Sequence, residues 1–327
     1  MKSFFKTFFA ALLALFIFSL LGFFILIGIA AAFSTDEKVA VAQNSVLVID
    51  ASETFLEQSK NDPFSELMNK KNGKQPSLSE LIGLLHYAKK DSSIKGIYIK
   101  CAGNPNGYAA TEEIRKALID FKKSNKFIVA YAETISQKGY MMANVADQIY
   151  THPQGGMEWA GFNYETIFFK GLIDKLEIEP QIFYAGKFKS ATEPFRYAQM
   201  SDANKLQTGI WLNSIYNNFI QGTAEMRQLN ADSIKAFANE GKVQNAKDAL
   251  KYKLVDGLLY DDQLKKIISK KLRVADETKI SFVSINNYAE SVALRGTGSG
   301  KIAVIYADGD VVMGKGQNEA IASDDYR

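Results

Sequence analysis

Two lysines set among aromatic residues are the most reactive feature of this 327-residue chain. Lys187 and Lys189 lie in the segment Tyr184-Ala-Gly-Lys-Phe-Lys-Ser-Ala-Thr-Glu-Pro-Phe195, directly after an apolar run at 181–184 that predicts a strand. A lysine held against aromatic surface loses hydration, which lowers its pKa, and a neutral amine can act as a general base near pH 7. The alternative is a pair of solvated loop lysines beside a turn at Pro194.

Composition makes several other kinds of site improbable. The chain has 39 basic and 36 acidic residues, so it lacks the basic excess of a nucleic-acid-binding protein. Its one cysteine, Cys101, forms no intrachain disulfide. Its two histidines, His86 and His152, are far apart in the sequence, so we expect no zinc site and no cofactor. A Ser-His-Asp triad stays open, although packing or surface roles are simpler for both histidines.

The amino-terminal region has the composition of a membrane-spanning helix. Residues 8–33 are almost wholly apolar, and at about 1.5 Å per residue such a helix exceeds a hydrocarbon core of about 30 Å. Lys2 and Lys6 precede it, and Asp36 and Glu37 follow it. The positive-inside rule then predicts a single-pass anchor in the bacterial inner membrane, with the globular part on the periplasmic side.

A cleaved signal peptide is the alternative for this region, because Ala30-Ala31-Ala32 fits a small-x-small cleavage pattern. The apolar run is longer than the core of about 7–15 residues typical of signal peptides, which favours an uncleaved anchor.

The remainder of the chain predicts an α/β protein with a mostly parallel sheet. Strands are expected at 45–50, 94–100 and 127–131, with amphipathic helices between them, one of which starts with a capping box at Ser77 and Glu80. A wide apolar stripe on a long helix at 201–228 indicates a core or oligomer contact. A further helix at 246–258 runs into a strand.

The tail repeats the pattern of the opening strand. A glycine-rich segment at 295–300 reads as a linker, and an apolar run at 302–307 predicts a strand similar to 45–50. We therefore expect four regions: a cytoplasmic tip and anchor at 1–35, a first α/β repeat at 36–294, a linker at 295–300, and the truncated start of a second repeat at 301–327.

Several of these segments, taken in order, resemble the signal peptide peptidase A (protease IV) family in its tandem-repeat form. The resemblance rests on the anchor, the lysine segment, Ser201-Asp-Ala-Asn204 before the long helix, Lys253-Leu-Val-Asp-Gly257, and the linker into a restarting strand. It implies a Clp protease/crotonase-like fold, a spiral of ββα units. It also implies a homo-oligomer that degrades signal-peptide remnants or other short apolar peptides.

The family cleaves peptides with a Ser–Lys dyad, and its lysine falls on Lys189 here, which leaves Lys187 without a role. The serine is expected from the second repeat, beyond Arg327, so we expect this chain alone to be inactive. Ser136 is the candidate within the chain, but Gln137 and Lys138 crowd it where relatives have glycine.

The family's Ser-Pro-Gly-Gly turn, whose N–H groups serve the oxyanion, reads Asn104-Pro-Asn-Gly107 here, without the adjacent glycine pair. This departure keeps open a non-catalytic, membrane-tethered scaffold of the same fold. An acyl-CoA enzyme of this fold is disfavoured by the anchor and the lysine segment.

Overall fold

The structure, a computed structural model, describes residues 2–33, 41–58, 75–292, 303–307, 309–316 and 320–324. The chain divides into two compact units, residues 1–40 and residues 41–327. The first unit holds helix α1, Lys2–Phe33, in which Ser3–Ile25 is long and apolar enough to cross a membrane. The predicted apolar helix is therefore confirmed, and both an anchor and an export signal are compatible with it.

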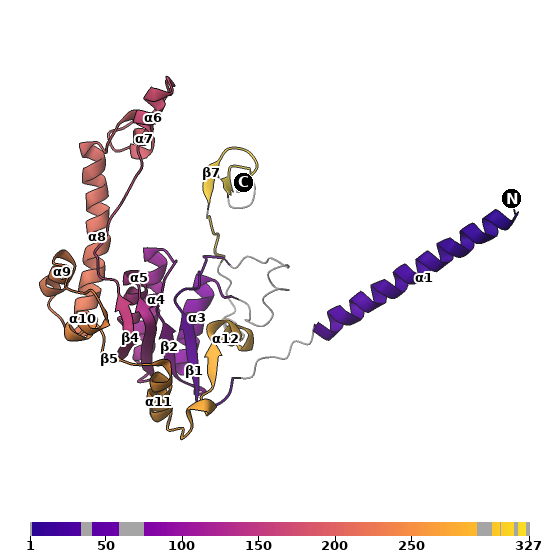
Figure 1. Cartoon of the computed structure of the whole chain (residues 1–327), viewed down its shortest axis with the longest axis horizontal. Helices are drawn as coiled ribbons and strands as arrows, with labels where there is room; N and C mark the ends of the chain where they lie inside the picture. Colours follow the sequence, from indigo (N-terminus) through magenta and orange to yellow (C-terminus); the bar gives the residue numbers. More distant parts are fainter. Residues whose placement is uncertain are drawn as a thin grey trace. The chain divides into compact units, whose positions relative to one another are not determined.

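Six parallel strands form the central sheet of the second unit, in the order β5-β4-β3-β2-β1-β6 (Figure 1). Their bounds are β1 Ser45–Asp50, β2 Ile94–Lys100, β3 Phe127–Ile135, β4 Gln148–Met157, β5 Gly257–Leu258 and β6 Phe282–Ser284. The three strands predicted from apolar runs are β1, β2 and β3, and the parallel α/β sheet confirms the predicted fold class.

The order of the strands explains which helices cover which face. From β1 to β4 each strand is added on the same side of the previous one, so right-handed crossovers place α3, α4 and α5 on one face. The step from β5 back to β6 crosses the sheet in the opposite direction, so the same handedness places α11 on the other face. Their bounds are α3 Leu78–Lys90, α4 Tyr108–Lys122, α5 Gln137–Ala143 and α11 Asp261–Leu272.

Alternate residues of the strands build two separate cores. Leu47 and Ile97 pack in the larger core with α3, α4 and α5, whereas Val46 and Tyr98 pack in a smaller core with α11. Side chains on both faces of these strands are buried, as the continuous apolar runs predict for a covered parallel sheet.

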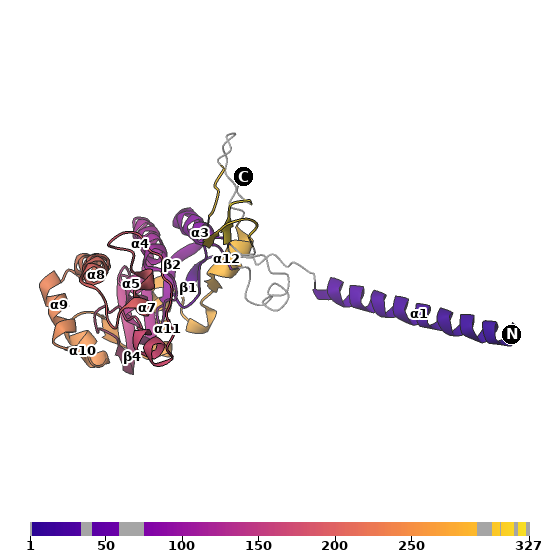
Figure 2. The same ribbon diagram turned by 90° about the horizontal axis from the view of Figure 1, so that it is seen from above.

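Further helices lie at the two edges of the sheet. Figures 1 and 2 show α8, α9 and α10 toward the β5 edge and α12 beside β1. Their bounds are α8 Asp202–Arg227, α9 Ala231–Asn239, α10 Ala246–Lys251 and α12 Ile285–Ser291. The predicted long helix is α8, but its apolar stripe is core only in part: Phe219 and Ile220 are buried, whereas Leu206, Ile210 and Trp211 are exposed.

The tail differs from its prediction. Residues 303–307 are irregular, not a strand, because no strand among the described residues lies beside them to complete a hydrogen-bonded ladder. Two short strands that follow, β7 Asp310–Val312 and β8 Ala320–Ala322, pair with each other in a separate parallel sheet. The predicted linker at 295–300 lies outside the described residues.

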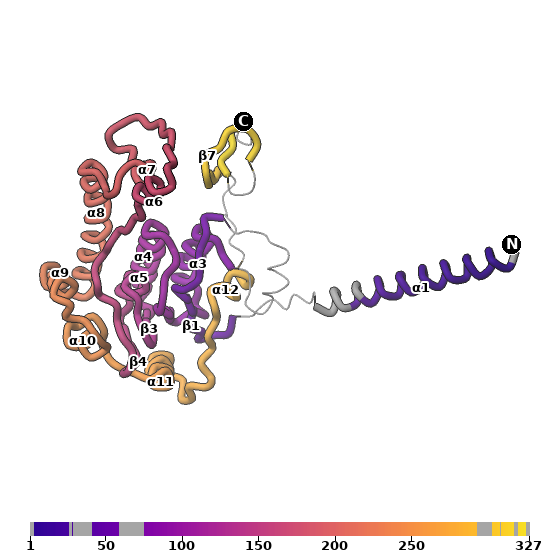
Figure 3. Tube along the Cα trace, turned by 45° about the horizontal axis from the view of Figure 1, so that its top comes forward, coloured from indigo at the N-terminus to yellow at the C-terminus, as the bar shows by residue number. Residues whose placement is uncertain are grey.

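A long insertion separates β4 from α9 and projects from the sheet. We call residues 160–212 the arm; it contains α6 Lys170–Lys175, the 3-10 turn η1 Ser190–Thr192, α7 Glu193–Arg196 and the first part of α8. Figures 1 and 3 show α6 and α7 beyond the amino-terminal end of α8, away from the strands.

Candidate active site

Lys189, the predicted general base, lies in the arm and not at the end of a sheet strand. Residues 181–184 have no regular secondary structure, so the strand predicted there is wrong. The physical reason is topological, because the sheet passes from β4 to β5 and leaves no neighbouring strand for this segment. Its apolar residues therefore stay on the surface, with Phe183 92% exposed.

A glycine turn on one side and a short helix on the other fix the backbone of Lys189. Gly186 has a φ of +100°, a conformation that residues with a Cβ rarely adopt. The Lys189 N–H donates to the Gly186 carbonyl at 3.4 Å and closes the turn. Lys189 then precedes η1, and α7 follows with Pro194 in its first turn, where the missing N–H does no harm.

A buried carboxylate joins this segment to the start of α8. The two oxygens of Glu193 accept hydrogen bonds from Ser201 N at 3.1 Å, Ser201 Oγ at 2.6 Å and Asn204 Nδ2 at 2.9 Å. Glu193 is only 3% exposed. Burial by itself raises the pKa of Glu193, but the hydrogen bonds from Ser201 and Asn204 outweigh burial and hold the pKa below its ordinary value.

We call these three residues the Glu193 knot. The knot links the lysine segment to Ser201-Asp-Ala-Asn204, the two motifs that the sequence resemblance used separately. Sequence reasoning missed the role of Glu193. The available signal was an acidic residue in a shared motif, followed eight positions later by a helix-capping serine.

Aromatic contacts complete the packing within the arm. The Arg196 guanidinium lies 3.7 Å from the Tyr184 ring centroid and 4.8 Å from that of Tyr197. Phe169 stacks on Phe195 with ring centroids 5.7 Å apart, and its N–H donates to the Pro194 carbonyl at 2.7 Å. These contacts organise the arm internally, although it has no buried core of its own.

The side chain of Lys189 is exposed, and so is that of Lys187. Within the described residues, the Lys189 amine has no ion pair or hydrogen bond, and the neighbouring ring of Phe188 is itself 49% exposed. The expectation that the segment's own aromatics keep this amine dry is therefore wrong for the single chain. Those aromatics lie on a projecting surface, so only a second surface could cover them.

Ser136 is committed to a structural role. It is the N-cap of α5, and its Oγ accepts a hydrogen bond from Gly139 N at 2.9 Å. Position 139 has no space for a side chain, because a Cβ there would lie 2.3 Å from the Cys101 carbonyl oxygen. The nearby lysine, Lys138, lies over the Tyr108 ring at 5.4 Å, and burial lowers its pKa.

The turn at 104–107 is filled by its own side chains. Asn104 Nδ2 donates to Thr111 Oγ1 at 3.0 Å, and Asn104 Oδ1 accepts from Asn106 N at 3.0 Å. Asn106 in turn accepts from Phe55 N at 2.7 Å. The backbone N–H of Asn106 is thus already used, and Pro105 has none, so neither residue offers a free donor to an oxyanion.

The remaining side chains that could take part in catalysis, the cysteine and the histidines, make packing or structural contacts or lie on the surface. Cys101 is buried, and burial raises the pKa of its thiol to about 12. His152 Nδ1 accepts from Gln154 N, and its ring packs edge-on against Tyr260. Neither His152 nor His86 bonds to a serine in the part of the chain that the structure describes. That same part contains no group of three or more His, Cys, Asp or Glu residues placed to hold a metal.

The parallel sheet covered by helices makes this chain an α/β protein, with a lysine-bearing arm inserted after β4. Residues 120–275, which contain both Ser136 and Lys189, match the model of peptidase family S49, and we call them the S49 region.

The curated relatives carry protease names, one of which specifies a serine protease. The chain is 30% identical over 247 residues to Protease 4 of Salmonella typhi, an alignment that covers 73% of this chain and 40% of the relative. It is 28% identical over 330 residues to Protease 4 of Haemophilus influenzae, covering 93% and 52%. It is 28% identical over 247 residues to the chloroplastic serine protease SPPA of Arabidopsis thaliana, covering 74% and 36%. The chain thus spans about half or less of these relatives, and the resemblance to signal peptide peptidase A is confirmed.

Two solved structures of a membrane-bound stomatin-specific protease, 1510-N, are also similar. They share 13% and 14% identity with this chain and give TM-scores of 0.38 and 0.40. Each alignment covers 75% of this chain, and 98% and 93% of the respective solved chains. One of the two holds a substrate peptide.

Proposed function

We propose that this chain is the lysine-bearing part of a membrane-anchored serine endopeptidase that degrades cleaved signal peptides and other short apolar peptides. The observation that carries the proposal is the Glu193 knot in the S49 region, which together with the Gly186 turn presents Lys189 on an ordered backbone. An amine presented in this way needs only a dry environment and a nearby hydroxyl to act as a general base.

In this mechanism the neutral amine of Lys189 removes the proton from a serine hydroxyl. The serine oxygen attacks the peptide carbonyl and forms a tetrahedral oxyanion. As that intermediate collapses, the Lys189 ammonium returns its proton to the departing amine, which leaves an acyl-enzyme. Water, deprotonated by the same amine, then hydrolyses the acyl-enzyme.

The serine in this proposal comes from a second repeat. Ser136 already caps α5, and the adjacent turn at 104–107 lacks free N–H donors at residues 105 and 106 for an oxyanion. Both observations argue against a complete site around Ser136.

A neighbouring repeat or a second copy of the chain would exclude the water to which Lys189 is exposed in the single chain. The structure describes every residue from 160 to 218, and no hydrophobic residue among them is buried. The arm instead exposes large apolar side chains, which favours its burial in a homo-oligomer. They are Tyr164, Ile167, Phe169, Leu172, Leu176, Ile178, Phe183, Tyr184, Phe188, Phe195, Tyr197, Leu206, Ile210 and Trp211.

The proposed location is the bacterial inner membrane, with α1 as an uncleaved anchor and the α/β unit on the periplasmic side. The charges that flank α1 support this orientation. An anchored peptidase also suits signal-peptide remnants, which are apolar and lie in or beside the bilayer.

Reading the gene downstream of Arg327 is the first test. The proposal expects a Ser-Pro-Gly-Gly turn followed by a serine flanked by glycines. A stop codon at that point would favour the second candidate, a non-catalytic membrane-tethered scaffold, whose supporting observation is the filled turn at 104–107.

Activity assays on apolar fluorogenic peptides provide the second test. Residues 1–327 alone should not cleave these peptides. If they did cleave them, and if Ser136→Ala abolished that cleavage, the proposal would be overturned. In a chain that includes the second repeat, Lys189→Ala should abolish turnover. Lys187→Ala is the matched control, because this exposed lysine lies on the same turn and should retain activity.

A further inference from the structure

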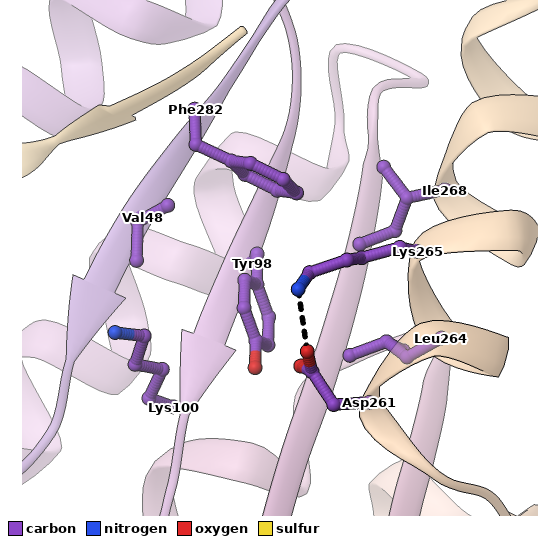
Figure 4. A pocket seen from close by; sticks show the side chains of 8 residues that line it. All are labelled: Val48, Tyr98, Lys100, Asp261, Leu264, Lys265, Ile268 and Phe282. Atoms are coloured by element: carbon purple, nitrogen blue, oxygen red, sulfur yellow. Dashed lines mark ion pairs between the residues drawn. The ribbon is translucent and has the colours of Figure 1, made fainter. Parts of the chain in front are cut away.

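A cavity of about 340 Å³ lies on the sheet face that α11 covers (Figure 4). It is bounded by α11 on one side and by strands β1, β2 and β6 on the other. The arm that carries Lys189 projects beyond α8, at the other end of the unit from α11 (Figure 1). The cavity is therefore separate from the proposed peptidase site.

Four of the eight residues that line the cavity are apolar. Val48 and Phe282 come from β1 and β6, and Leu264 and Ile268 come from α11. The volume lies at the small end of the range of about 300–1,000 Å³ typical of ligand pockets. The cavity has room for a short apolar chain.

The cavity also contains a tyrosine hydroxyl. The side chain of Tyr98 is only 8% exposed, and Figure 4 shows its hydroxyl directed into the space between Lys100 and Asp261. In the part of the chain that the structure describes, this hydroxyl has no hydrogen-bond partner, yet it is not sealed from solvent. Burial raises the pKa of Tyr98, and the nearby Asp261 carboxylate raises it further, so the group stays a hydrogen-bond donor at neutral pH.

Of the three charged residues that line the cavity, two pair with each other. Asp261 and Lys265 form an ion pair at 2.6 Å and neutralise each other. Lys100 has no ion pair among the described residues. Asp50 lies beside it on the neighbouring strand, but the Asp50 carboxylate accepts from Ser52 N and makes no ion pair with Lys100. The cavity thus offers one unpaired ammonium and one unused hydroxyl beside an apolar wall.

We propose that this cavity binds an apolar chain that ends in a carboxylate. The carboxylate accepts hydrogen bonds from Lys100 Nζ and Tyr98 OH, and the chain packs against Val48, Phe282 and Ile268. The C-terminus of a short apolar peptide and a free fatty acid share this chemistry. The site does no catalysis, and its occupation does not depend on the proposed peptidase activity.

The test measures binding to the full chain in lipid nanodiscs, with empty nanodiscs as the reference. The ligands are two matched pairs, acetyl-Leu-Leu-Phe as the acid and as the amide, and hexanoate with hexanamide. At least one acid should bind about tenfold more tightly than its amide, the usual worth of a charge-assisted hydrogen bond. The pair that binds identifies peptide or fatty acid as the source, and equal binding of acid and amide in both pairs would overturn the proposal.

Variants assign the two polar groups. Lys100→Met should weaken acid binding about tenfold, and Tyr98→Phe should weaken it several-fold, because each removes one donor and keeps most of the packing. Lys95→Met on the same strand is the matched control, because Lys95 is exposed and does not line the cavity. Equal behaviour of the Lys100 and Lys95 variants would refute the assignment.

A measurement on the unaltered chain covers the case in which a variant fails to fold. A bound acid should slow amine-directed labelling of Lys100 and leave labelling of Lys95 unchanged. Absence of this selective protection at saturating acid would also overturn the proposal.

Discussion

The Glu193 knot offers the sharpest test of how the arm is held together. Glu193→Ala removes the acceptor of three hydrogen bonds from a residue that is 3% exposed. Hydrogen bonds to a charged group contribute about 1.5–3 kcal/mol each and do not add. Water entering the vacated space can reach the Ser201 donors, whereas Asn204, 7% exposed, stays buried without its partner. We therefore expect the free energy of local opening to fall by about 2–3 kcal/mol, roughly the contribution of one such hydrogen bond.

This loss should appear as local opening, because the knot joins only α7 to the start of α8. Amide hydrogen exchange, followed by mass spectrometry in peptides that cover 184–208, reports that opening. A change of about 2–3 kcal/mol corresponds to exchange about 30- to 150-fold faster. Peptides from β1 to β3 should exchange as before.

Two further variants make this test specific. Glu193→Gln keeps one acceptor oxygen for the two N–H donors and should cost only about 1 kcal/mol. Glu179→Gln, at an exposed glutamate in the same arm, should change nothing. If Glu193→Ala raised exchange by less than about threefold, or if the Glu179 variant matched it, the reasoning from the knot would be refuted.

Three other predictions follow from the structure. Gly139→Ala should destabilise the α/β unit by about 1–3 kcal/mol in denaturant unfolding, since its Cβ would meet the Cys101 carbonyl oxygen at 2.3 Å; an unchanged midpoint would contradict the geometry of α5. Arg227→Met should lower the free energy of unfolding by about 2 kcal/mol, because the Arg227 side chain is 8% exposed and pairs with Asp256 at 2.8 Å. Asp256 is 33% exposed, so the loss is smaller than for a fully buried ion pair. The lowered pKa of Glu193 contributes stability that is present above the ordinary value of 4.5 and is lost as pH falls through the lower folded-state value. The stability difference between the parent chain and Glu193→Gln should therefore shrink in acid, and a difference constant from pH 7 to pH 3 would rule this out.

The sequence was sufficient for the elements whose signal is local. Apolar runs identified β1, β2 and β3, and Ser77 with Glu80 forms the predicted capping box, with Glu80 N donating to Ser77 Oγ at 3.2 Å and Ser77 N to Glu80 Oε2 at 2.8 Å. The failures concern segments whose conformation depends on what lies beside them. Residues 181–184 and 303–307 have strand-like composition, but a strand forms only where another strand can pair with it.

The candidate site divides in the same way. The lysine segment was recognisable from residue order, because the Gly186 turn, Pro194 and the Ser201 cap are local features. The Glu193 knot was not, because it depends on how η1 and α7 turn back toward α8. The sequence neighbours of Lys189 could not predict whether its amine is shielded from water either, because aromatic residues lower the hydration of an amine only where packing encloses it.

Exposure of Lys189 and exposure of the apolar arm have one physical explanation on our proposal. In the single chain the side chain of Lys189 is exposed to water, so the water-free environment in which a lysine can act as a general base is missing. The apolar side chains around Lys189 give a partner surface its reason to bind there, and the same binding would remove water from the amine. Assembly would then create the base and protect the arm in a single step. Polar substitutions on the arm, such as Phe183→Ser, should therefore lower assembly and turnover together, while Lys189→Ala should lower turnover alone. A Phe183 variant that assembled poorly yet cleaved normally would separate the two roles and contradict this explanation.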